Sequence, residues 1–119
     1  MLIEWLPRIG AGLMLIIGLV GFFKPRAFTE NMQITLNSNM ALSEARTVFG
    51  GLNVGGALMG LILHTPPVYM TLGTAWFFGL LARFYSMFAD GSTLKESIPG
   101  IMVDLLMAGL LLSGFFLSP

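Results

Sequence analysis

Two charged residues stand inside segments that are otherwise apolar enough to cross a lipid bilayer. Arg83 interrupts the run 67–89, and Asp104 interrupts the run 98–117. A charge at the centre of a spanning helix costs roughly 3 kcal/mol on insertion scales, so such residues usually pair and often mark a site. Each lies about 9 Å along its helix from the connection between the two runs. We therefore predict that Arg83 and Asp104 meet at one level and contact each other.

Other polar residues accompany this pair. At about 100° per residue, Arg46 and Asn53 lie on one face of the segment 44–63. The candidate polar cluster comprises Glu44, Arg46, Asn53, Arg83, Asp90 and Asp104. It has three interpretations: a structural ion pair satisfied by Asn53, a binding site for a ligand or substrate, and a path for protons or ions. Six polar groups are more than one structural pair requires, which supports the binding interpretation beside the structural one.

The composition argues against several other chemistries. Cysteine is absent, which removes disulfides, thiolate catalysis and cysteine-ligated metals. His64 is the single histidine, and no spacing of it with carboxylates resembles a haem or di-iron site, so we expect no metal and no cofactor. We expect His64, beside Pro66 and Pro67, to be a solvated turn residue. The net charge of zero offers no basic surface for nucleic acid.

The elements that position the cluster must be membrane helices. Of the 119 residues, 55% are hydrophobic and only 10% are charged, and the mean hydropathy is +0.84. A soluble domain carries about 25% charged residues. The sequence therefore predicts an all-α integral membrane four-helix bundle that forms a single domain over residues 1–119. Its spans are about 5–23, 44–63, 67–89 and 98–117, with an interfacial loop at 24–43.

The basic residues indicate the orientation of these spans. Five of the six lie in or near the connections between the first two and the last two spans, namely Lys24, Arg26, Arg46, Arg83 and Lys95. The positive-inside rule places both connections in the cytoplasm and both termini on the opposite, periplasmic side. The candidate cluster then lies in the cytoplasmic half of the bundle.

Local signals place the ends of the helices. Pro25 can start a short helix on the membrane surface, with Phe28, Met32 and Leu36 on one face. Ser43 is a candidate N-cap for the second span. The other boundary signals are Asp90–Gly91 as a turn after the third span, and Ser97 and Pro99 at the start of the fourth.

The second span is rich in glycine. Two GxxxG matches, 51–55 and 56–60, overlap a run of small residues that allows helices to approach closely, within one chain or between chains. The candidate packing residues are Gly50, Gly51, Gly55, Gly56 and Gly60.

Two stretches resemble a known family. Residues 43–51 (SEARTVFGG) resemble the E-x-R-x-x-Y-G-G start of the second helix in small bacterial four-helix membrane proteins. Residues 83–91 (RFYSMFADG) resemble their R-x-x-S-x-x-x-D-G pattern on the third helix, and Asp104 stands where they carry a glutamate. This family is known as a domain of unknown function and is similar to DoxX-type four-helix proteins. The resemblance covers nearly the whole chain and implies the fold and a bacterial inner (plasma) membrane location, but no activity.

A second resemblance is to the membrane-embedded glutathione transferases. These enzymes also have four helices and carry Arg and Asn seven residues apart on the second helix, as Arg46 and Asn53 are here. Residues 82–85 resemble a stretch of their third helix. Phe49 and Gly56 occupy the positions of a second arginine and a glutamate in their motif, which removes much of the charge that would hold glutathione.

The function that the sequence predicts is binding rather than catalysis. We expect a small inner-membrane binding or accessory protein with a polar pocket in the cytoplasmic half of the bundle. Its partners would be the lipid bilayer, a lipid or small amphiphilic ligand, and a second copy or a larger membrane complex. The alternative is a glutathione-transferase-like enzyme that acts on a lipophilic substrate.

Overall fold

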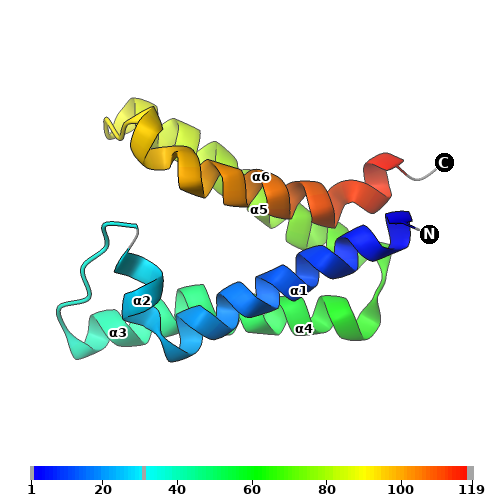
Figure 1. The fold of residues 1–119 in the computed structure, drawn as a ribbon, viewed down its shortest axis with the longest axis horizontal. Helices are drawn as coiled ribbons and strands as arrows, with labels where there is room; N and C mark the ends of the chain where they lie inside the picture. The colour runs from blue at the N-terminus through cyan, green and yellow to red at the C-terminus, as the bar shows by residue number, and fades with distance from the viewer. Residues whose placement is uncertain (1, 31, 118–119) are drawn as a thin grey trace. The chain divides into compact units, whose positions relative to one another are not determined.

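The computed structural model describes residues 2–30 and 32–117, and within them every regular element is a helix (Figure 1). The predicted all-α class is confirmed. The elements are α1 (Leu2–Phe23), α2 (Pro25–Glu30), α3 (Asn39–Ala45), the π-helix η1 (Arg46–Gly51), α4 (Leu52–Leu63), α5 (Pro66–Ala89) and α6 (Leu94–Leu117).

Three helical stretches of the described chain are long and apolar enough to cross a membrane: Trp5–Phe23, Asn39–Leu63 and Leu94–Phe115. The third predicted span, 67–89, corresponds to α5. Its 24 residues give it sufficient length, but it is not among these three helices. Its sequence includes Arg83 and several hydroxyl and glycine residues, which reduce its mean hydropathy.

The chain divides into two compact units. The first contains Met1–Gly10 and His64–Pro119, and the second contains Ala11–Leu63. In the first unit α5 and α6 run side by side as a helical hairpin (Figure 1). The spacing of the buried residues places them on one face of each helix: Tyr69, Gly73 and Leu80 on α5, and Asp104, Met107, Ala108 and Leu111 on α6.

At the turn of this hairpin, the end of α5 agrees with the prediction and the start of α6 does not. α5 ends at Ala89, and Gly91 has a φ of 74°, so the predicted turn at Asp90–Gly91 is confirmed. α6 begins at Leu94, three residues before the predicted start at Ser97. The reason is a capping box: the Thr93 hydroxyl accepts a hydrogen bond from the Glu96 amide, and the Glu96 carboxylate accepts one from the Thr93 amide.

In the second unit one continuous helical stretch covers α3, η1 and α4, and it too begins earlier than predicted. Ser38, not Ser43, is the N-cap, because its extended backbone lets its hydroxyl accept a hydrogen bond from the Ala41 amide at 3.0 Å.

The connection before this stretch holds only one turn and a half of helix. α2 ends at Glu30, so Met32 and Leu36 do not continue its face as predicted. Phe28 turns toward the protein, because its ring packs on that of Phe49 with centroids 5.1 Å apart.

Candidate functional site

Arg83 and Asp104 form the predicted ion pair. The Nε group of Arg83 on α5 donates a hydrogen bond to Oδ2 of Asp104 on α6, with 2.5 Å between the two atoms. The two partners differ in burial: the Asp104 side chain is 4% exposed, whereas that of Arg83 is 40% exposed. The aspartate is therefore the fixed, desolvated member of the pair, and the arginine is the member that reaches the surface.

A glycine on α6 makes room for the guanidinium. A Cβ atom at Gly100 would overlap the guanidinium carbon and nitrogens of Arg83. Gly100 precedes Asp104 by four residues, so the two lie on the same face of α6, one turn apart. The planar group of Arg83 thus lies against bare backbone while its Nε faces the carboxylate. In the sequence, the only sign of this contact is that Gly100 is a small residue one turn from Asp104. The GxxxG motifs lie on a different helix.

This arrangement leaves part of the guanidinium available for recognition. Among the described residues, Asp104 is the one hydrogen-bonding partner that Arg83 has. The planar fork of an arginine matches a carboxylate or a phosphate, and a guanidinium already oriented by a buried acid loses less freedom when it binds one. Chemically, the pair can therefore orient a cation toward an anionic group.

Asp90 lies further along α5 and makes a local contact instead. The hydroxyl of Ser86 donates a hydrogen bond to Asp90 Oδ2 at 2.8 Å, and both residues belong to the C-terminal turn of α5. Asp90 is exposed and stands about 10 Å along the helix axis from Arg83.

Two of the three cluster residues of the second unit bond to backbone carbonyls. Arg46 Nη1 donates to the Phe22 carbonyl at 2.5 Å and so satisfies one of the free carbonyls in the last turn of α1. Asn53 Nδ2 donates to the Phe49 carbonyl at 2.8 Å. Glu44 is exposed on α3. Within this unit, Arg46 and Asn53 therefore serve the backbone.

The two backbone contacts flank the π-helix, which the sequence analysis missed. The Leu52 amide bonds to the carbonyl of Thr47, five residues earlier, so the hydrogen-bond ladder is wider here than in an α-helix. The bond from Asn53 goes to a carbonyl within this ladder, that of Phe49. The glycine pair at its end, Gly50–Gly51, is the signal that a wider turn is sterically possible here.

The glycines of the second unit divide into two groups. A Cβ at Gly50 would lie 2.6 Å from the backbone of Phe22, and one at Gly21 would lie 2.8 Å from the Phe49 carbonyl. Gly18 on α1 similarly faces the Val54 amide, so α1 crosses η1 and the start of α4 at backbone distance. Gly55, by contrast, is exposed, with no neighbouring atom within 4 Å of an added Cβ. Gly60 is buried, while Gly51 and Gly56 are half-buried.

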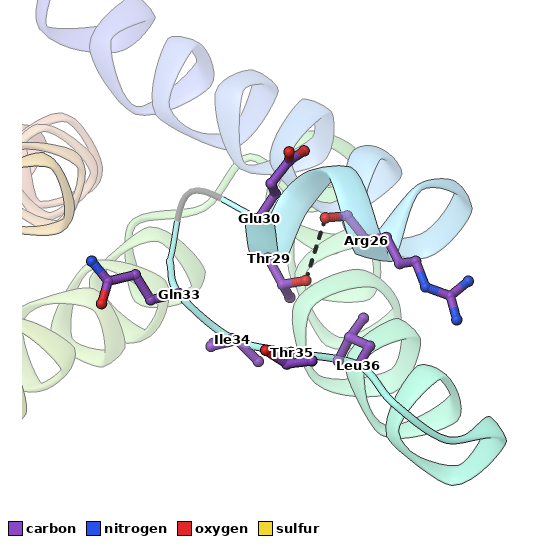
Figure 2. Close-up of a pocket in the computed structure, with 7 residues that line it drawn as sticks. All are labelled: Arg26, Thr29, Glu30, Gln33, Ile34, Thr35 and Leu36. Carbon is purple, nitrogen blue, oxygen red and sulfur yellow. Dashed lines mark hydrogen bonds between the residues drawn. The ribbon is translucent and has the colours of Figure 1, made fainter.

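A hollow of about 610 Å³ opens on the second unit beside α2 (Figure 2). Its lining consists of Arg26, Thr29, Glu30, Gln33, Ile34, Thr35 and Leu36. Figure 2 shows the charged groups of Arg26 and Glu30 directed away from each other, so no set of polar groups converges there. None of the six cluster residues lines this hollow. In the described part of the chain, no group of three or more His, Asp or Glu side chains could hold a metal ion.

His64 is not the solvated residue that the sequence analysis expected. It is half-buried and in contact with two other side chains: Arg8 Nε lies 3.2 Å and the Tyr69 hydroxyl 2.7 Å from its Nδ1. Its φ of 47° is consistent with the predicted turn.

The sequence as a whole matches one family model. The model describes a domain of unknown function, DUF4345, and it aligns with residues 4–115. No curated protein and no solved structure matches the chain.

Proposed function

The chain belongs to the DUF4345 family of unknown function, and on that premise we propose that it is a small membrane-embedded binding protein in which Arg83 holds the anionic group of a lipid or another amphiphile. Asp104 orients the guanidinium, and the ligand is held without being chemically changed. The apolar helices support a membrane location, since three of them are long and apolar enough to span a bilayer.

The observation that carries this proposal is the unequal burial of the ion pair. A purely structural pair has no need of a half-exposed arginine, because a charge in the bilayer is stabilised best when it is enclosed. Here the carboxylate is enclosed and the guanidinium is 40% exposed. The acidic group of an amphiphile is a partner that the exposed edge of Arg83 can bind at that depth.

The proposal includes the topology that the basic residues favour. The protein is a four-helix bundle in a bacterial inner membrane, with α5 as the third of its four spans and both termini in the periplasm. Arg83 then lies about 9 Å inside the cytoplasmic end of α5. An amphiphile bound to it holds its acidic group deeper in the membrane than the surrounding lipid headgroups.

The glutathione-transferase alternative gains no support from the contacts. Its resemblance depends on Arg46 and Asn53, and both side chains donate to backbone carbonyls of their own unit. A thiol-tripeptide would have to displace these bonds before either side chain could bind it.

Lipid co-purification tests the proposal. Native mass spectrometry of the purified wild-type protein should detect a bound anionic amphiphile. Arg83→Lys, which keeps the charge but loses the planar fork, should lower the bound fraction by about tenfold, a loss typical of one bidentate charge-assisted contact. Arg26→Gln is the matched control, because it removes an exposed arginine outside the pair.

The bound fraction distinguishes the two interpretations of the pair. Loss in Arg83→Lys with retention in Arg26→Gln supports binding at Arg83. Equal retention in both variants means that the pair is structural, and equal loss in both means that the amphiphile responds to charge in general. Either of the last two results contradicts the proposal.

A further inference from the structure

The end of α5 at the hairpin turn carries a negative charge where a helix ordinarily favours a positive one. Asp90 is the C-cap residue of α5, and the last turn of this helix contains no basic residue. The C-terminus of a helix is the negative end of its macrodipole, so lysine or arginine stabilises it and a carboxylate opposes it. The macrodipole therefore disfavours an acid at this position.

The Asp90 carboxylate also lacks a cation. Its Oδ2 accepts a hydrogen bond from the neutral Ser86 hydroxyl. Within residues 2–30 and 32–117, no lysine or arginine side chain forms an ion pair with Asp90. The residue is exposed, so a cation that approaches from outside the protein can reach it.

The guanidinium of Arg83 lies on the side of Asp104 that faces the same turn. Its Nε bonds to Asp104, whereas its Cζ and Nη1 are the atoms closest to a Cβ placed at Gly100. Gly100 is one turn nearer the start of α6, and therefore nearer the hairpin turn, than Asp104 is. Arg83 and Asp90 are seven residues apart, which places them on one face of α5 about 10 Å apart along its axis.

This helix face thus presents two opposite charges in a fixed order. A simple anion bound at Arg83 leaves Asp90 without a cation. A molecule that carries an anionic group and, a few atoms further along, an ammonium group can bind to both residues. The anionic group then lies deeper in the membrane and the ammonium lies at the level of the turn. The phosphate and the ammonium of an ethanolamine phospholipid follow each other in this order, because the phosphate is the group attached to the acyl-chain end.

We propose that the amphiphile held by Arg83 is a phospholipid with an ammonium group in its headgroup, whose phosphate binds Arg83 and whose ammonium binds Asp90. This assignment rests on the proposed function, because it requires Arg83 to bind an acidic group. Gly79 supports a lipid rather than a soluble molecule. It lies one turn deeper than Arg83 on α5, it is exposed, and no atom lies within 4 Å of a Cβ added to it, so an acyl chain has room below the phosphate.

Competition between two lipids tests the assignment. The purified full chain in detergent receives equal amounts of dioleoyl phosphatidylethanolamine and dioleoyl phosphatidylglycerol, and native mass spectrometry measures how much of each is bound. The two lipids share the phosphate and the acyl chains, and only the first has an ammonium group. The wild type should bind the ethanolamine lipid about fivefold more than the glycerol lipid, the ratio expected from one exposed ion pair.

Two variants locate the group that selects the headgroup. Asp90→Asn should lower the ratio to about one, and it should still bind the glycerol lipid as the wild type does, because Arg83 is unchanged. Glu30→Gln is the matched control, since it removes an exposed acid of the second unit, and it should keep the wild-type ratio.

The ratio and the total amount of bound lipid separate the two proposals. Equal binding of the two lipids by the wild type, or a preference that persists in Asp90→Asn or disappears in Glu30→Gln, would overturn the headgroup assignment. Arg83→Lys should lower the total of both lipids, and an unchanged total would contradict the proposed function instead. An excess of free phosphoethanolamine should not displace the ethanolamine lipid. Displacement would assign the site to a soluble ligand and would equally overturn the inference.

Discussion

At the scale of single residues, the unequal burial of Arg83 and Asp104 makes the two possible single substitutions unequal. Arg83→Met leaves a carboxylate that is 4% exposed without its cation, and stranding a buried charge typically costs about 3–5 kcal/mol. Asp104→Asn leaves a guanidinium that is already 40% exposed and can turn toward water or lipid headgroups, so it should cost clearly less. Reversible unfolding in mixed micelles measures both values.

The double variant Arg83→Met with Asp104→Asn supplies the coupling between the two residues. It should recover part of the loss caused by Arg83→Met, because no charge is then stranded. If the double variant lost as much stability as the two single variants together, the ion pair would contribute nothing to folding. Equal costs of the two would show that their difference in burial has no energetic consequence.

At the scale of elements, the two groups of glycines in the second unit predict opposite effects of the same substitution. Gly50→Ala places a methyl group against the backbone of Phe22, which cannot move aside as a flexible side chain would, so α1 and η1 must separate. Gly55→Ala adds a methyl group in open space and should be neutral or stabilising by up to about 1 kcal/mol, since alanine favours a helix. Thermal unfolding of the purified variants in detergent compares them.

The matched pair also decides what the GxxxG pattern means. A large loss of stability in Gly50→Ala with none in Gly55→Ala assigns close packing within the chain to Gly50 and not to Gly55. Similar unfolding temperatures for both variants and the wild type would contradict the close crossing of α1 and η1.

The elements show how far the sequence could predict this structure. Long apolar runs indicate helices, and the cost of an unpaired charge in such a run predicts the contact between Arg83 and Asp104, which lie 21 residues apart. The first residue of a helix is harder to predict, because serine occurs at several positions that could serve as the N-cap. The Thr93–Glu96 capping box is recognisable in the sequence, where Ser97 and Pro99 are competing signals for the start of α6.

Other contacts depend on tertiary placement and leave little trace in the sequence. The glycine pair Gly50–Gly51 makes a wider turn sterically possible, but the π-helix itself is selected by what packs on it, here Phe22 against Gly50. Arg46 looked like a site residue because its type and position suit an anion, yet it bonds to a carbonyl of α1. Which partner a surface arginine takes is decided by the nearest unsatisfied acceptor, and that is a property of the fold.

At the scale of the whole molecule, the number of membrane crossings decides where Arg83 can find a ligand. With four spans in the proposed orientation, the connection near Ser38 and the turn near Ser92 would face the cytoplasm, whereas Thr65 and the C-terminus would face the periplasm. The composition of α5 alone does not establish that it crosses, because α5 is not one of the three stretches that satisfy both length and hydropathy. Its ion pair with α6 offsets the cost of inserting Arg83, so we expect α5 to cross.

Single-cysteine labelling measures these sides directly, because the chain contains no native cysteine. In intact cells, a membrane-impermeant maleimide should label Thr65→Cys and Ser118→Cys but should not label Ser38→Cys or Ser92→Cys until the membrane is disrupted. If α5 did not cross, Ser92→Cys would be labelled in intact cells while Ser118→Cys would be protected, since α6 would then run in the opposite direction. The pair of positions 92 and 118 thus separates four crossings from three, and labelling of Ser92→Cys in intact cells would remove Arg83 from the cytoplasmic side.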